Sequence, residues 1–272
     1  MKIYMFCFDN SQKIFNFVAY YVCFLKIIIP PDRKTIKNNN IIIYLNNKKT
    51  MWLFNSSIGK KVIMAVTGMA LILFLTFHMS MNVVALFSAE GYNMICEMLG
   101  ANWYAVVATL ALAALAVIHI IYAFILTMKN RAARGTERYA VTEKPSKVEW
   151  ASQNMLVLGL IVLVGLCIHL YNFWAKMMLV ELIGEGDLSR TTDGAYWIQE
   201  TFSQPGYVVL YLVWLVALWF HLSHGFWSML QTMGLNGKVW FTRWKVISIA
   251  YATLLFAGFA AVVVWFYIQS VC

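Results

Sequence analysis

Residues 151–175 read ASQNMLVLGLIVLVGLCIHLYNFWA, a stretch without a charged side chain. At a rise of about 1.5 Å per residue, a helix of this length crosses the roughly 30 Å of hydrocarbon in a bilayer. Trp150 precedes the stretch and Trp174 lies near its end, where the aromatic belts of membrane helices lie. The stretch therefore predicts a transmembrane helix.

Four further stretches have the same character, at about 61–87, 103–128, 206–230 and 246–268, and none of the five contains Asp, Glu or Arg. Of the 272 residues, 61% are hydrophobic and 12% are charged, against about 25% charged in soluble domains. The mean hydropathy is +0.68. This composition excludes a disordered chain and argues against nucleic-acid binding. We predict an all-α integral membrane protein in which residues 51–272 form one domain of five transmembrane helices.

Residues 1–50 differ from the rest of the chain. They are rich in Ile, Lys, Asn, Phe and Tyr, whose codons are AT-rich, and they contain no Gly, Trp or Glu. Their charges are scattered, unlike those of a signal peptide. We interpret this extension as translated upstream DNA that precedes a natural start at Met51. The alternative is a short extra anchor at 14–29, which Lys26 interrupts.

The positive charge of the chain is unevenly distributed. Residues 1–50 carry 8 basic and 2 acidic residues, which is +6 of the net +9. Of the other 13 basic residues, 11 fall on one side of the predicted membrane. The positive-inside rule places that side in the cytoplasm. We therefore predict a multi-pass membrane protein with the N-terminus and the 129–149 loop in the cytoplasm and the C-terminus outside. The bacterial inner membrane is the predicted location. The 11 residues are Lys60, Lys61, Lys129, Arg131, Arg134, Arg138, Lys144, Lys147, Lys238, Arg243 and Lys245, whereas Lys176 and Arg190 lie on the other side.

All five histidines of the chain fall within predicted spans, where ionisable side chains are costly and usually functional. His78 lies about 17 residues past Lys61, which is 25 Å from the inner end at the helical rise. His169 lies about 19 residues past Trp150, on a span that runs in the same direction, so the same rise gives it a similar depth. Both histidines are thus expected in the outer half of the membrane.

The next two histidines are expected in the inner half. His119 precedes Lys129, and His221 precedes Gln231, by the same spacing of about 10 residues, so each lies 15 Å from the inner end of its helix. Four helices thus carry one histidine each, at two levels. Two imidazoles that face each other across a helical bundle are typical axial ligands of a b-type haem. We predict that the first four helices form a haem-binding bundle with two haem b groups, one held by His78 and His169, the other by His119 and His221.

Three small residues lie about one turn from these histidines and could leave room for a haem: Gly165, Ala116 and Gly225. The alternative is that they serve close helix packing. His224 follows His221 at the i+3 position, on nearly the same face. It is an alternative ligand, a hydrogen-bond donor to a haem propionate or a quinone, or a polar residue at the membrane interface.

The five cysteines form no metal or redox motif. Cys7, Cys23, Cys96, Cys167 and Cys272 contain no C-x-x-C pair and no C-x-x-C-H. The sequence therefore does not support a zinc site, a thioredoxin-like motif or covalent haem attachment.

Two segments resemble a known family. Residues 57–68 read SIGKKVIMAVTG and are followed by His78 and Asn82. This segment resembles the opening of the dihaem cytochrome b subunit of succinate:quinone oxidoreductases. Residues 220–228, FHLSHGFWS, resemble that family's H-x-x-x-G on the fourth helix. The resemblance covers about 57–270.

The resemblance implies the membrane anchor of a succinate dehydrogenase or a fumarate reductase. It implies that His78 and His169 hold the distal haem and that His119 and His221 hold the proximal haem. It also implies flavoprotein and iron–sulfur partner subunits on the cytoplasmic face, and a membrane quinone, for which the family analogy favours menaquinone. The anchor itself would be a non-catalytic subunit that conducts electrons between the iron–sulfur subunit and the quinone.

One position departs from the family pattern. Some members have a glutamate two residues before the fourth ligand, where this chain has Trp219, and no carboxylate lies in any predicted span. A quinone site on the outer side would exchange protons with the exterior. Glu90 and Glu97 are candidates to serve it, although both also fit as solvated loop acids. Two alternatives stay open: the dihaem anchor of a hydrogenase or formate dehydrogenase, and a haem-free transporter with histidines along its path.

Overall fold

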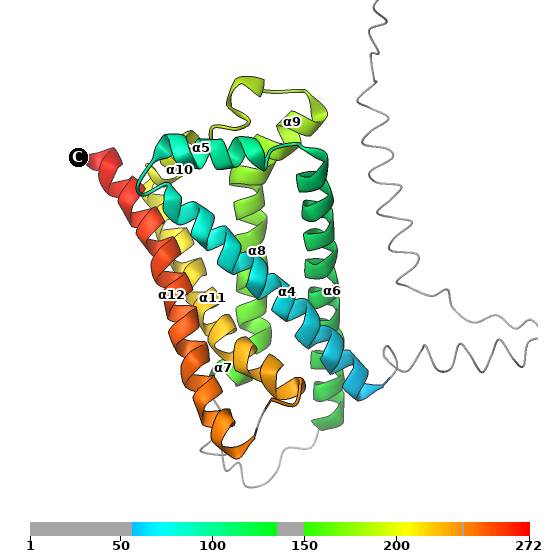
Figure 1. Ribbon diagram of the computed structural model, residues 1–272. Coiled ribbons are helices and arrows are strands. Elements are labelled where there is room, and N and C mark those ends of the chain that lie inside the picture. The colour runs from blue at the N-terminus through cyan, green and yellow to red at the C-terminus, as the bar shows by residue number, and fades with distance from the viewer. Residues whose placement is uncertain (1–55, 135–149, 236) are drawn as a thin grey trace, which may run out of the picture.

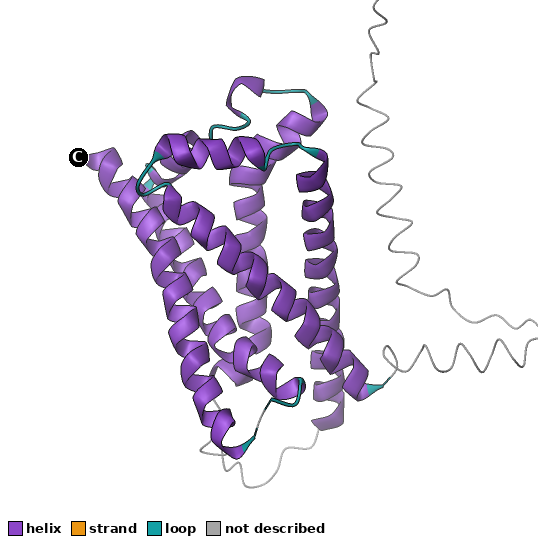
Figure 2. Ribbon diagram, viewed as in Figure 1, coloured by secondary structure: helices purple, strands orange, loops and turns teal. Residues whose placement is uncertain are grey.

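The computed structural model describes residues 56–134, 150–235 and 237–272. Every regular element in these ranges is a helix (Figure 2), and five helical segments are long and apolar enough to cross a membrane. The predicted all-α, multi-pass membrane fold is therefore confirmed. The extension 1–50 and residues 135–149 of the basic loop lie outside the described ranges.

The five spans run through the chain in order (Figure 1). They are α4 (Ser57–Val84), α6 (Trp103–Arg134), the continuous series α8 (Met155–His169), η1 (Leu170–Leu179) and α9 (Val180–Ile183), then α11 (Pro205–Thr232) and α12 (Lys238–Val271). The shorter elements are α5 (Ala89–Met98), α7 (Trp150–Gln153), η2 (Leu188–Arg190) and α10 (Gly194–Phe202).

Local sequence explains where several of these helices begin and end. The Ser56 hydroxyl accepts a hydrogen bond of 2.8 Å from the Gly59 N–H and so caps α4. Pro205 occupies the first turn of α11, where its missing N–H costs nothing. Gly184 ends α9 with a left-handed φ of +74°, a conformation that glycine adopts without a steric penalty.

The third span differs from its expected limits of 151–175. A turn at Asn154 separates α7 from α8, and the helix continues to Ile183, with 170–179 wound as a π-helix. The continuation carries Lys176 and Glu181 in its last turns, beyond the predicted limit of 175. The Glu181 carboxylate accepts a 3.0 Å hydrogen bond from the Ala101 N–H. Lys176 and Glu181 lower the hydropathy of this part of the chain. A prediction from apolar residues therefore ends the helix before its observed end at Ile183.

The two ends of the bundle differ in their elements. At one end α4 begins, α6 ends and α12 begins, while α5, α9 and α10 lie at the other end with the C-terminus (Figure 1). Lys60, Lys129 and Lys238 consequently lie at the same end, as the distribution of charge predicts. Which end faces the cytoplasm stays a prediction.

The best-packed part of the protein joins α10, α11 and α12. Tyr211 and Leu215 of α11 pack with Val262 and Phe266 of α12 and with Phe202 of α10. Elsewhere large apolar side chains are exposed on the spans, such as Leu73, Val107 and Leu254. An apolar exterior of this kind fits contact with lipid.

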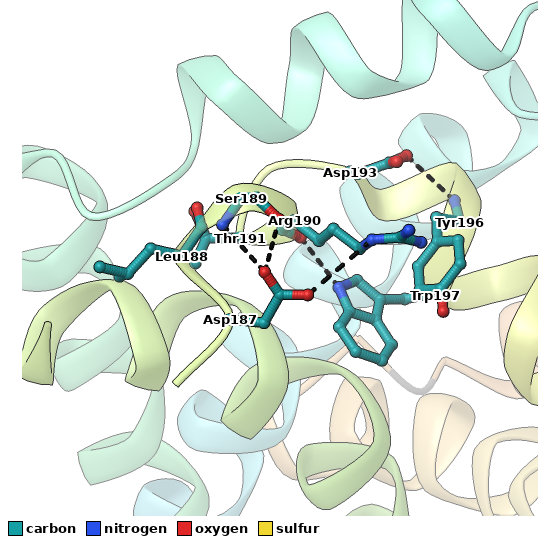
Figure 3. Close-up of polar contacts among 8 residues, drawn as sticks. All are labelled: Asp187, Leu188, Ser189, Arg190, Thr191, Asp193, Tyr196 and Trp197. Carbon is teal, nitrogen blue, oxygen red and sulfur yellow. Dashed lines mark hydrogen bonds and ion pairs between the residues drawn. The ribbon is translucent and has the colours of Figure 1, made fainter. Parts of the chain in front are cut away.

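Polar contacts hold α5 to α10 at the end that carries the C-terminus. The Asn93 amide donates to the Asp193 carboxylate over 2.8 Å and accepts from the Ala195 N–H over 2.9 Å. Figure 3 shows the adjoining loop, where the Arg190 carbonyl accepts from the Trp197 indole at 2.9 Å and the guanidinium lies over the Tyr196 ring. Asp193 also accepts from the Tyr196 N–H at 3.1 Å (Figure 3). These contacts order the end at which the connection 184–204 lies.

Candidate functional site

His78 and His169 come together between the first and third spans. Their ring centroids lie 5.8 Å apart and the ring planes are nearly perpendicular, at 84°. His78 projects from the last third of α4, and His169 is the last residue of α8, just before the π-helix. The two histidines predicted to share the outer level are thus direct neighbours.

Aromatic side chains surround this outer pair. Phe74 stacks on His78 with a centroid distance of 5.3 Å, and Phe259 of α12 lies 5.8 Å from it. Phe173 and Trp214 lie 5.1 and 5.7 Å from the His169 ring. Aromatic rings thus lie beside both imidazoles.

His119 of α6 and His221 of α11 are the two histidines predicted at the inner level. Their rings approach different neighbouring spans. The His119 ring reaches α4, where its Nδ1 lies 3.1 Å from the Thr67 Oγ1. The His221 ring reaches α8, where a Cβ added to Gly159 would lie 3.6 Å from its Cε1. The His119 ring thus lies against the polar Thr67 of α4, and the His221 ring lies against the small Gly159 of α8.

His224 lies near the inner pair but contacts other residues. Its ring packs edge-on against Trp227 of the same helix, with the ring centroids 4.8 Å apart. This arrangement fits a secondary position beside His221. The three roles considered for His224 stay predictions.

The small residues thought to leave room for a haem have different surroundings. A side chain at Gly165 would collide with the Trp214 indole, whose N–H donates to the Val162 carbonyl over 3.0 Å. The prediction that Gly165 leaves room for a haem is therefore wrong, because Trp214 of α11 fills that space. A Cβ at Gly225 would only touch the Met155 Cε, at 4.0 Å, so room remains there. Ala116 is partly exposed.

Sequence reasoning missed Thr67, Gly68 and Gly159, the residues that lie against the inner histidines. A depth comparison could have found Thr67. Thr67 follows Ser57 by the same number of residues as His119 precedes Lys129. At the helical rise, both residues therefore lie roughly 15 Å from the inner ends of their helices. Sequence reasoning also missed the buried amide of Asn172, which donates to the Tyr211 hydroxyl at 3.2 Å.

The residues present fit a haem held by two imidazoles. His78 and His169 would together hold such a group, because imidazole nitrogens are usual protein ligands of haem iron and the two rings lie 5.8 Å apart. The buried Nδ1 atoms of His169 and His221 have no hydrogen-bond partner in the described part of the chain, although buried polar atoms nearly always have one. In residues 103–133 of α6, Ala105 is the only buried residue.

The acids predicted to serve a quinone lie together at the end that carries the C-terminus. Glu90 and Glu97 of α5 line an open hollow of about 390 Å³ with Asn93, Thr192 and Asp193. Cys96 lies on the same helix, and burial raises the pKa of its thiol to about 11. The hollow brings carboxylates of α5 close to the loop before α10.

Comparison of the chain with protein-family profiles, curated proteins and solved structures finds no match. The candidate site therefore rests on the arrangement of its own histidines.

Proposed function

We propose that this chain is the membrane anchor of a succinate dehydrogenase or fumarate reductase complex, a dihaem cytochrome b that conducts electrons between an iron–sulfur subunit and a membrane quinone. The observation that supports it most is the contact between His78 and His169, 5.8 Å apart on two membrane spans. A second histidine pair lies on the other two spans of the four. Two pairs on four helices are what two haems need.

Each histidine has a role in this proposal. His78 and His169 hold the distal haem, and His119 and His221 hold the proximal haem. When bound, haem iron supplies a one-electron redox centre at each level. The residues of the chain set the spacing of the two sites and their polarity. Phe74 and Phe259 keep water away from His78, while Thr67 gives His119 a polar neighbour.

The basic end of the bundle is the proposed docking side for the flavoprotein and iron–sulfur subunits. Lys60, Lys129 and Lys238 lie at this end, which the positive-inside rule assigns to the cytoplasm of a bacterial inner membrane. The C-terminus then lies outside. The same charges also serve as the topology signal.

The hollow at the opposite end supports a quinone site on the outer side, with menaquinone as the favoured quinone. Glu90 and Glu97 line it and could exchange protons with the exterior. At the position where some family members carry a glutamate, the Trp219 indole N–H donates to the Thr253 hydroxyl at 2.9 Å. This indole does not release a proton, so proton exchange at the outer side is the simpler route.

Purification of the full chain from its native membrane tests the proposal. We expect flavoprotein and iron–sulfur subunits to co-purify and the preparation to oxidise succinate or reduce fumarate with a quinone. Co-purifying hydrogenase or formate dehydrogenase subunits would favour the other dihaem anchor. A preparation without any Soret band would contradict both and favour a haem-free transporter.

A further inference from the structure

We infer that Thr67 sets the tautomer of His119, so that Nδ1 carries the proton and Nε2 is the nitrogen left to bind metal. The inference rests on the proposed function, because it takes His119 as a ligand. Thr67 is then a positioning residue: it acts on the metal through the imidazole. The two residues belong to different spans, α4 and α6.

The hydrogen bonds of the Thr67 hydroxyl carry the argument. Its Oγ1 lies 2.8 Å from the Ile63 carbonyl and 3.1 Å from the Met64 carbonyl, both one turn earlier on α4. A hydroxyl has one hydrogen to donate, and a carbonyl oxygen can only accept. The hydrogen is therefore directed at the carbonyls, and an oxygen lone pair faces the Nδ1 of His119, 3.1 Å away. A lone pair can only accept, so Nδ1 donates.

The surroundings of the ring reinforce this polarity. The Met64 carbonyl, 3.1 Å from the Thr67 hydroxyl, is a further acceptor on this turn of α4. Thr67 is only 4% exposed, which leaves little room for water to replace it. A Cβ added to Gly68 would lie 3.3 Å from the His119 Cε1, closer than most side-chain contacts. Thr67 thus binds one edge of the ring, and Gly68 leaves space for it.

The other inner histidine has no such partner. The buried Nδ1 of His221 makes no hydrogen bond to the described part of the chain. Of the two ligands proposed for the proximal haem, His119 is therefore the one whose second ring nitrogen has a side-chain hydrogen-bond acceptor, the Thr67 hydroxyl. An acceptor at the second ring nitrogen orients a ligand imidazole and raises its basicity, and its loss typically costs about 10–100-fold in metal affinity. A change at Thr67 should alter one haem and leave the other unchanged.

The test compares three full-length variants: Thr67→Val, Thr67→Ser and Thr76→Val. Valine keeps the shape of threonine and removes the acceptor, whereas serine restores it. Thr76 is the matched control on α4, because its hydroxyl bonds the Ile72 carbonyl and Tyr251 and contacts no histidine in the described ranges. The readouts are haem per chain, the low-spin ferric signals in electron paramagnetic resonance, and the midpoint potential of each haem.

We expect Thr67→Val to shift one of two low-spin signals, raise the midpoint potential of that haem, and weaken its retention about tenfold or more. Thr67→Ser should restore all three readouts, and Thr76→Val should match the wild type. If Thr67→Val does not accumulate, Gly68→Ala should disturb the same signal, because it displaces the same ring. Two unchanged haems in Thr67→Val would overturn the inference and leave the proposed function intact. A wild-type chain without haem would instead overturn the proposed function.

Discussion

The imidazole of His78 on the first span lies 5.8 Å from the imidazole of His169 on the third, with the two ring planes 84° apart. The two side chains project from separate helices into one aromatic enclosure, where Phe74 stacks on His78 and Trp214 lies beside His169. The proposed function takes both histidines as ligands of one haem. Their substitutions should therefore have the same consequence.

Replacing either outer histidine should remove the same haem. We expect His78→Ala and His169→Ala each to lower the haem content from two per chain to one and to abolish the same spectral component, because one axial ligand alone holds the iron weakly. Reduced-minus-oxidised spectra of the purified variants measure this. The pairing would be wrong if the two variants lost different components.

The inner level should depend on His221 and not on His224. His221 is the histidine of α11 that lies against Gly159 of the third span, whereas His224 packs on Trp227 of its own helix. We expect His221→Ala to lose the second spectral component and His224→Ala to keep both. The reverse result would show that His224 is the ligand.

The contact of Gly165 with Trp214 should make Gly165 sensitive to a single added methyl group. Overpacking a well-packed site typically costs about 1–3 kcal/mol, so we expect Gly165→Ala to lower the melting temperature of the purified protein. The matched control is Gly206→Ala near the start of α11, where an added Cβ meets nothing within 4 Å. Alanine favours a helix over glycine by up to about 1 kcal/mol, so the control should be neutral or stabilising. Equal melting temperatures of the two variants would argue that Trp214 moves freely away from Gly165.

The thiol of Cys96 should react slowly at neutral pH. Burial raises its pKa to about 11, and the thiolate is the reactive form. At pH 8 only about one thiol in a thousand is then ionised, and the fraction rises about tenfold per pH unit until the pH approaches 11. We expect maleimide to label the exposed Cys272 quickly and Cys96 slowly, with Cys96 labelling accelerating above pH 8.

Serine at Cys7, Cys23 and Cys167 isolates these two thiols for that measurement. Mass spectrometry of the two peptides gives each rate separately. Labelling of Cys96 at a rate that does not change between pH 8 and pH 10 would show that its thiol is not held in the buried, neutral state.

The five spans and the depths of the histidines could be predicted because both depend on local properties. An apolar run long enough to cross a bilayer is visible in the chain itself, and a fixed rise per residue turns position into depth. That reasoning brought His78 and His169 to one level, and the structure places their rings together. It also placed Lys60 and Lys129 at one end of the bundle.

The contacts between helices could not be predicted in the same way. Gly165 was expected to leave room for a cofactor, but Trp214 from another span fills that space, and no local pattern shows which residue faces which. The third helix continues through the π-helix that follows His169 and so passes Lys176. A prediction from hydropathy ends this helix too early, at residue 175. Thr67 was missed because a lone threonine in an apolar run marks no site by itself, and only a comparison of its depth with that of His119 relates the two residues.

The haem content of the purified full-length chain tests the central claim most directly. A pyridine haemochrome assay together with the protein concentration gives the number of b haems per chain. The proposed arrangement predicts two, with one lost in both His78→Ala and His169→Ala and the other lost in both His119→Ala and His221→Ala. A chain that contains no haem, or whose haem survives all four substitutions, would contradict it.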